Sequence, residues 1–258
     1  CPNKSQFFSG NCRLGRPLQV ASPIGNAAPV IFQTRNTVED SQTNDQPIDC
    51  QFRSPHIRSL GYAGWLALLT MAVVFYRERT IFMDGAFQLV ELINTPAPII
   101  YHYRITNPLT HFLALFAVLL ELPLRWGLLV YSVNFVLFFG AVYYLIVRVF
   151  RNDYLGWVQL LFFTLLALDS FYFLPPEFYQ GISLLLLWFA MLLYDRRLEK
   201  GWTLPGLLLL LIPVVFAHKL VSVFFLFAWA FFWLDRPVLR RGRYYLLLAC
   251  FLVLTVVH

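Results

Sequence analysis

Eight ionisable residues are the candidates for chemistry in this otherwise apolar sequence. They are Asp84, His102, Arg104, His111, Asp169, Glu177, His218 and Lys219. A carboxylate can take a proton from a hydroxyl or an amine, and basic side chains can stabilise an anion as its charge develops. The histidines lack a metal-binding spacing such as H-E-x-x-H, which favours polar packing over a metal site. We therefore expect acid–base and anion-binding chemistry with no cofactor, and a divalent metal stays an open alternative.

Each candidate also has a purely structural explanation. Asp84 and Glu177 lie near predicted helix starts, where a carboxylate is favoured by the helix dipole. Arg104 and Lys219 could extend to lipid phosphates without any catalytic role. Asp169, at the outer end of an apolar run, is harder to explain as a cap, and its structural alternative is a hydrogen bond to a neighbouring helix. Both kinds of explanation stay open at this point.

The composition predicts a polytopic membrane protein. The chain is 59% hydrophobic and only 13% charged over 258 residues, and the apolar residues come in long runs. This is too apolar for a water-soluble domain. The net charge of +6 does not indicate nucleic-acid binding, because the basic residues form short clusters between apolar runs, where they orient helices in a membrane.

Seven apolar segments are predicted to span the membrane as helices. They cover 60–76, 126–149, 155–173, 178–194, 204–217, 220–234 and 244–257. Pro205 and Pro213 predict a kink in the fifth segment. The fold class is therefore an all-α membrane bundle of about seven transmembrane helices.

Charge distribution decides how the long insert 77–125 is arranged. Three of the later connections are basic, and they carry Arg148, Arg151, Arg196, Arg197, Lys200, Arg236, Arg240, Arg241 and Arg243. These connections lie on the cytoplasmic side together with Arg53 and Arg58 only if the chain crosses the membrane once between the N-terminal tail and the insert. The apolar segment 109–124 is also short for a span. We therefore expect the first outer loop to carry two interfacial helices, near 84–93 and near 108–122, and to place the candidate residues at the outer face.

The chain divides at about residue 57. Residues 1–57 are polar and lack helical periodicity, which predicts a disordered cytoplasmic tail. Residues 58–258 form the transmembrane module. The chain begins at Cys1 and stops at His258 inside an apolar run, so we expect a module truncated at its C-terminus. The four cysteines form neither a metal spacing nor a disulfide framework.

The sequence of the insert resembles a known family. One spanning segment is followed by "FMDGAFQLVELIN" and then by "NPLTHFLALFAVLLELPLRWGLLVYSVNFVLFFGAVYYLIVRVF". This pattern is similar to the first third of the C-superfamily membrane glycosyltransferases, which include the protein mannosyltransferases and the aminoarabinose transferases. The resemblance covers roughly residues 58–258. Asn107-Pro108-Leu109 stands where the family has Pro-Pro-Leu, and Gly85 follows Asp84 where many relatives have a second acid.

The resemblance implies transfer of a hexose or pentose from a polyprenyl-phosphate donor, with inversion, to a glycan, lipid or protein acceptor. Asp84 matches the catalytic acid of the first outer loop, and Glu177 matches a second outer acid better than Asp169 does. A carboxylate at Asp84 would take the acceptor's proton, and Arg104, Lys219 and His218 would stabilise the departing phosphate. The remaining candidates, His102, His111 and Asp169, are then expected to bind substrate. The expected location is the plasma membrane of a bacterium or archaeon, with the N-terminus in the cytoplasm.

Two other functions stay open. A transporter or flippase would place its acids near the bilayer midplane and build its helices from two related halves. A non-catalytic membrane assembly subunit would tolerate substitution of Asp84 and Glu177. Asp84, Glu177 and a basic residue around one outward-facing cavity would favour the transferase, and scattered acids would favour the assembly subunit.

Overall fold

The structure, a computed structural model, describes residues 55–81, 83–98, 100, 104–165, 177–195, 198–235 and 242–258. For Met83 and Asp84 it describes the backbone alone. These ranges form helices and the turns between them and contain no strand. The all-helical fold class is thus confirmed for this part of the chain.

The described helices follow one another in a fixed chain order. They are α1 (Pro55–Val74), α2 (Tyr76–Thr80), α3 (Met83–Asn94), α4 (Asn107–Leu119), α5 (Leu124–Tyr144) with a π-helical turn (Leu145–Val149), α6 (Asp153–Leu165), α8 (Glu177–Tyr194), α9 (Thr203–Val215), α10 (Lys219–Asp235) and α11 (Gly242–Val257). Most bounds fall within a few residues of the predicted ones. The first helix begins at Pro55, earlier than predicted, and breaks after Val74, where the separate short helix α2 follows. The predicted end of the 155–173 segment lies outside the described residues.

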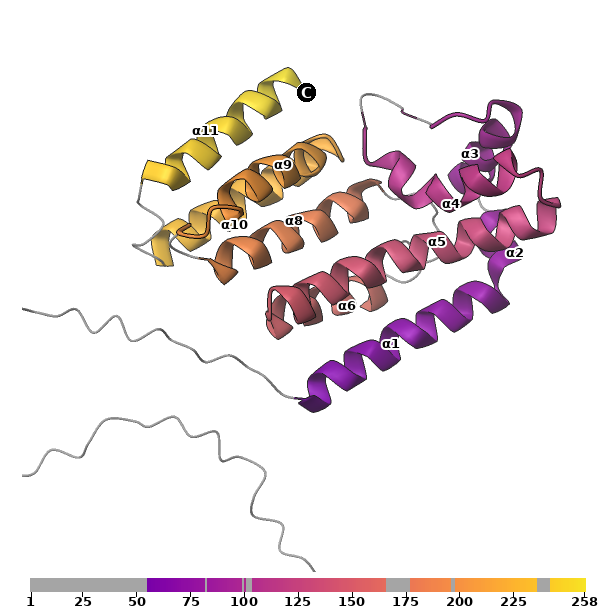
Figure 1. Ribbon diagram of the computed structural model, residues 1–258, viewed down its shortest axis with the longest axis horizontal. Helices are drawn as coiled ribbons and strands as arrows, with labels where there is room; N and C mark the ends of the chain where they lie inside the picture. Colours follow the sequence, from indigo (N-terminus) through magenta and orange to yellow (C-terminus); the bar gives the residue numbers. More distant parts are fainter. Residues whose placement is uncertain are drawn as a thin grey trace, which may run out of the picture. The chain divides into compact units, whose positions relative to one another are not determined.

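The long helices lie side by side, and α2, α3 and α4 gather at one end of them (Figure 1). Successive long helices run in alternating directions. We call the end where α5, α8 and α10 begin the Arg104 end, and the end where α1, α6, α9 and α11 begin the Arg58 end. The insert contributes α3 and α4 to the Arg104 end, within the segment predicted to hold two surface helices. Their position relative to a membrane stays a prediction.

Three helices are long and apolar enough to cross a membrane. Within the described residues these are His56–Val74, Leu124–Val149 and Glu177–Tyr194, of 19, 26 and 18 residues. Large apolar side chains also cover much of the surface, as on α10, where Phe227 is 74% exposed and Leu234 is 70% exposed. Such a surface is unfavourable in water and favourable against lipid. Both observations support the predicted membrane location.

Aromatic residues fill two adjoining cores. One core joins α1, α5 and α6 around Trp65, Phe139 and Phe163. The other joins α8 to α9, α10 and α11, and Trp188 lies at its centre. The Trp188 indole N–H donates to the Leu207 carbonyl over 2.9 Å, so this buried ring has its polar atom satisfied.

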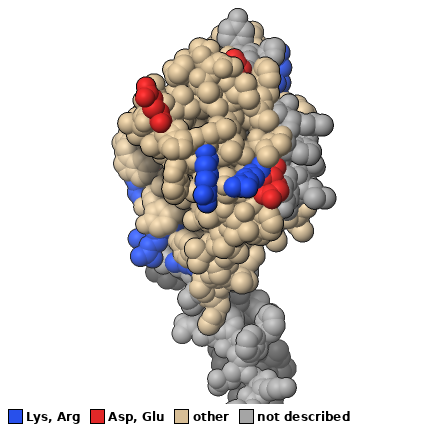
Figure 2. All heavy atoms as spheres, turned by 90° about the vertical axis from the view of Figure 1, so that its right-hand side faces the viewer, with Lys and Arg blue, Asp and Glu red and all other residues tan. Residues whose placement is uncertain are grey.

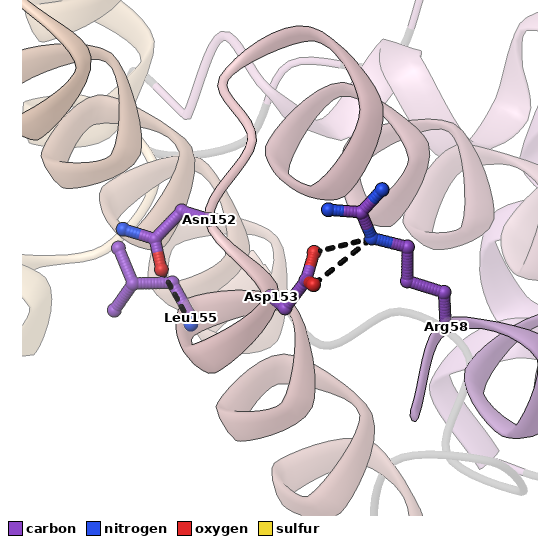
Figure 3. Close-up of polar contacts among 4 residues, drawn as sticks. All are labelled: Arg58, Asn152, Asp153 and Leu155. Carbon is purple, nitrogen blue, oxygen red and sulfur yellow. Dashed lines mark hydrogen bonds and ion pairs between the residues drawn. The ribbon is translucent and has the colours of Figure 1, made fainter. Parts of the chain in front are cut away.

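An ion pair ties α1 to α6 at the Arg58 end (Figure 3). The Nε atom of Arg58 donates to both carboxylate oxygens of Asp153, at 2.8 and 2.9 Å. The neighbouring Asn152 caps α6, because its Oδ1 accepts the Leu155 N–H over 3.1 Å. The first turn of α6 is therefore held both by its own cap and by α1.

The predicted tail, residues 1–57, falls almost wholly outside the described residues. Of the basic residues used to assign the topology, Arg53, Arg196, Arg197, Arg236, Arg240 and Arg241 also lie outside them. Arg58, Arg148, Arg151, Lys200 and Arg243 belong to helices or connections at the Arg58 end. These five therefore share one end of the helices.

Candidate functional site

Arg104 and Glu177, both predicted site residues, form an ion pair at the Arg104 end. A guanidinium nitrogen of Arg104 donates to a carboxylate oxygen of Glu177. Arg104 precedes the turn that leads into α4, and Glu177 is the first residue of α8, so the pair joins segments 73 residues apart. The Arg104 side chain is 30% exposed and that of Glu177 is 12% exposed. The guanidinium thus stays accessible to an anion from outside.

His218 lies in the turn between α9 and α10. Its Nδ1 accepts the Leu220 N–H over 3.2 Å, which caps the start of α10, and its ring packs edge-on against Phe178. Burial lowers the pKa of His218, and the positive charge of Arg104 lowers it further. The histidine is therefore favoured in its neutral form, with Nδ1 as an acceptor. Lys219, the next residue, is exposed at the first position of α10.

His258 joins these residues from the end of α11. Its ring lies 5.0 Å from that of Phe216, centroid to centroid. Burial lowers the pKa of His258, with further contributions from the charges of Lys219 and then Arg104. The sequence pattern does not single out His258 as a candidate. The alternating directions of the predicted spans could have identified it, because the residue that follows the last span lies at the same end of the bundle as His218.

These five residues make up what we call the basic cluster: Arg104, Glu177, His218, Lys219 and His258. The basic cluster thus combines the Arg104–Glu177 ion pair and the Lys219 amine with two imidazoles whose pKa values are lowered. Figure 2 looks onto this end of the molecule, where basic and acidic side chains stand next to each other in an otherwise mostly uncharged surface. Such a group can bind an anion through Arg104 and Lys219 and exchange protons through the histidines.

His111 lies inside the protein, between α4 and α5. The side chain is 2% exposed. Its Nδ1 contacts the Asn107 carbonyl over 2.6 Å and its Nε2 contacts the Tyr131 hydroxyl over 3.0 Å. Burial lowers the pKa of His111 to about 4, although the bond to Asn107 acts in the opposite direction. In this structure both ring nitrogens are used by the protein, so His111 orients α4 on α5.

The buried polar residues around His111 continue toward α8. The Gln180 amide donates to the Thr110 hydroxyl over 2.7 Å, and that hydroxyl lies 3.3 Å from the Asn107 carbonyl. Through this chain the start of α4 is fixed to α8 three residues after Glu177. The contact explains how Arg104, three residues before the start of α4, is brought to Glu177.

The remaining predicted site residues are described in part or not at all. Asp84 is the second residue of α3, and its side chain is outside the described part of the structure. His102 and Asp169 lie outside the described residues. Among the described side chains, no three His, Cys, Asp or Glu groups come together in a way that could hold a metal ion.

Known proteins provide no assignment for the basic cluster. The chain matches no protein-family model, no curated protein and no solved structure. The geometry of the Arg104 end is therefore the basis for inferring a function.

Proposed function

We propose that this protein is an integral membrane glycosyltransferase that moves a hexose or pentose from a polyprenyl-phosphate donor to an acceptor at the outer membrane face. The observation that carries the proposal is the basic cluster. It groups an accessible guanidinium, an ammonium and two neutral imidazoles with a carboxylate at one end of an apolar helical bundle. A membrane-bound phosphate ester needs such a combination at the surface of the bilayer.

In this proposal α1, α5, α6, α8, α9, α10 and α11 cross the membrane, and α3 and α4 lie along its outer surface. The alternating helix directions and the three helices of spanning length support this arrangement. The basic residues at the Arg58 end give the orientation, since Lys and Arg mark cytoplasmic connections. The N-terminus is then cytoplasmic, and the Arg104 end faces outward.

The reaction is a single displacement. The acceptor oxygen or nitrogen attacks the anomeric carbon, the bond from that carbon to the phosphate oxygen breaks, and the electron pair leaves with the polyprenyl phosphate. Asp84 takes the proton released by the acceptor. Arg104 and Lys219 stabilise the phosphate, Glu177 holds Arg104 in position, and His218 donates to a phosphate oxygen from Nε2, because its Nδ1 is already an acceptor. Direct attack inverts the anomeric centre.

A donor-cleavage assay tests the proposal. The full-length protein in phospholipid nanodiscs is given a panel of radiolabelled polyprenyl-phosphate hexoses and pentoses together with membrane extract as acceptor. We expect release of polyprenyl phosphate with one donor, and we expect Asp84→Asn to abolish it while expression and thermal unfolding stay unchanged. Glu78→Gln, which removes an exposed acid from α2 at the same end, is the matched control and should keep full activity.

Three results would contradict parts of this proposal. The first is full activity of Asp84→Asn, which would exclude Asp84 as the base and leave the transferase itself in place. The second, measured in vesicles, is movement of an intact donor across the bilayer, as expected of a transporter. The third is neither cleavage nor movement with any donor, as expected of a non-catalytic assembly subunit.

A further inference from the structure

A pocket separate from the basic cluster lies where α3, the end of α4 and the start of α5 meet. Its volume is about 230 Å³. Its walls are apolar apart from one carboxylate, and they include Leu89, Ile93, Ala117, Val118, Glu121 and Gly127. It shares no residue with the basic cluster.

Gly127 gives independent evidence that this space is open. The residue is buried in α5, yet a Cβ placed on it would meet no atom of the described residues within 4 Å apart from its own stretch of helix. A buried glycine with an empty side-chain direction faces a cavity, whereas Gly181 and Gly156 have a neighbouring atom within 3 Å of that position. A larger side chain at residue 127 can therefore fill the pocket without displacing its walls.

The surroundings of the pocket indicate a lipid chain as its occupant. Three of the residues that line it are themselves partly open to the outside, because Ile93 is 41% exposed, Leu122 is 44% exposed and Leu124 is 59% exposed. Trp126, which follows on α5, is also exposed, and tryptophan is frequent where a protein meets the lipid head groups. An aliphatic chain can pass from this apolar surface into the pocket without crossing water.

The carboxylate of Glu121 favours a positively charged lipid head group at the pocket. It is an exposed carboxylate at the pocket, and it forms no ion pair with any described residue. Arg125, the basic residue in the first turn of α5, interacts instead with the Tyr76 hydroxyl. The carboxylate stands just past the C-terminus of α4, where the helix dipole also favours a positive charge.

Glu121 occupies a backbone position that disfavours its own side chain. Its φ is 52°, in the left-handed region. The Glu121 N–H donates to Val118 and the Leu122 N–H donates to Ala117, the hydrogen-bond pattern of a helix end that usually carries glycine at this position. A glutamate there costs stability that a glycine would not.

We propose that this pocket binds a membrane lipid with a primary ammonium head group, with an acyl chain between α3 and α4 and the ammonium on Glu121. The ammonium donates a charge-assisted hydrogen bond to the carboxylate. The same carboxylate repels an anionic head group. The inference does not depend on the transferase activity, because none of the residues involved belongs to the basic cluster.

Photocrosslinking in phosphatidylcholine nanodiscs tests the inference with the full chain. The probes are phosphatidylethanolamine and phosphatidylglycerol that carry the same diazirine-bearing acyl chain, and the labelled peptides are identified by mass spectrometry. We expect phosphatidylethanolamine to label residues 89–93 and 117–127 about tenfold more than phosphatidylglycerol does, the effect of one hydrogen bond to a charged group. Gly127→Phe should remove the labelling of this region by both probes.

Two substitutions at Glu121 separate the head group from the fold. Glu121→Gln should keep the chain in the pocket and reduce the ratio between the two probes to near one. Glu121→Gly should do the same while raising the unfolding temperature, because it relieves the left-handed backbone. Glu78→Gln and Gly201→Phe, an acid and an open glycine away from the pocket, are the matched controls and should label like the wild type.

The inference is overturned if the wild type is labelled equally by both probes, or if Glu121→Gln leaves the ratio unchanged. Labelling spread along α10 and α11 with no preference for this region also overturns it. If Gly127→Phe lowers the unfolding temperature, the two Glu121 variants still decide the head-group preference.

Discussion

The ion pair between Arg104 and Glu177 is the residue-level basis of the proposed site. It lies at the surface and is only partly buried, so solvent screens part of the attraction. In a double-mutant cycle of Arg104→Gln and Glu177→Gln, we expect a coupling energy of about 1 kcal/mol, between the values of exposed and buried pairs. Thermal unfolding in detergent measures it.

The double-mutant cycle is needed because Glu177 has other interactions besides the ion pair, and Glu177→Gln alone would disturb those as well. Arg125→Gln combined with Glu177→Gln is the control, and its effects should add because Arg125 interacts with the Tyr76 hydroxyl. Additive effects of Arg104→Gln and Glu177→Gln would mean that the pair contributes nothing to stability.

His111 gives the protein a pH-dependent stability. Its pKa is about 4 in the folded protein, below the ordinary value of 6.5. Above pH 6.5 the imidazole is neutral in both states, and as the pH falls toward 4 only the unfolded chain takes up the proton. Folding stability should therefore decrease by about 3 kcal/mol between pH 7 and pH 4 through this residue.

Unfolding by denaturant across this pH range measures the effect. His111→Gln should show a shallower dependence on pH, although it is less stable at pH 7 because a hydrogen bond is lost. His56→Gln, at an exposed position, should follow the wild type. If the unfolding free energy depends on pH equally in all three proteins, the protonation of His111 does not contribute to the pH dependence of stability.

At the scale of the helices, glycines decide how closely the helices approach. A Cβ on Gly181 of α8 would lie 2.5 Å from the Val221 Cγ2 atom and 2.9 Å from the Ala217 Cβ atom. Gly181→Ala should therefore destabilise the protein by about 1–3 kcal/mol, the usual effect of overpacking a core. Thermal unfolding measures this loss.

Two further variants separate overpacking from helix propensity. Val221→Ala in the Gly181→Ala background should recover part of the loss, because it removes the nearest methyl group. Gly127→Ala, which meets nothing within 4 Å, should be neutral or stabilising by up to about 1 kcal/mol through its higher helix propensity. A Gly181→Ala variant as stable as Gly127→Ala would contradict the close approach of α8 and α10.

At the scale of the whole molecule, the sequence predicts the helices better than the contacts between them. A long apolar run predicts a helix, because in lipid the backbone N–H and C=O groups must form hydrogen bonds within the run itself. Charge distribution then assigns Arg104 and Glu177 to the same end of the bundle. It does not show that they touch, because that contact depends on Gln180 and Thr110 fixing α4 to α8.

The site residues that the sequence predicted least well are those whose environment depends on packing. His111 is typical of a candidate ligand in sequence but is enclosed between α4 and α5. Arg58 counts only as a cytoplasmic charge in sequence, whereas in the structure it pairs with Asp153, a residue that no motif singles out. Burial and pairing across helices set these roles, and neither is encoded in local spacing.

The proposed topology predicts opposite accessibility for the two ends. Thr95 follows α3 on the Arg104 side and Gly201 precedes α9 on the Arg58 side, and both are exposed in turns. In a chain whose native cysteines are replaced by serine, Thr95→Cys should react in intact cells with a membrane-impermeant maleimide, whereas Gly201→Cys should react only after permeabilisation. If α4 stays on the outer surface, three crossings, by α5, α6 and α8, separate the two positions. A fourth crossing by α4 would place both positions on the same side, so equal accessibility of the two cysteines, with both or neither reacting in intact cells, would make the 109–124 segment a spanning helix.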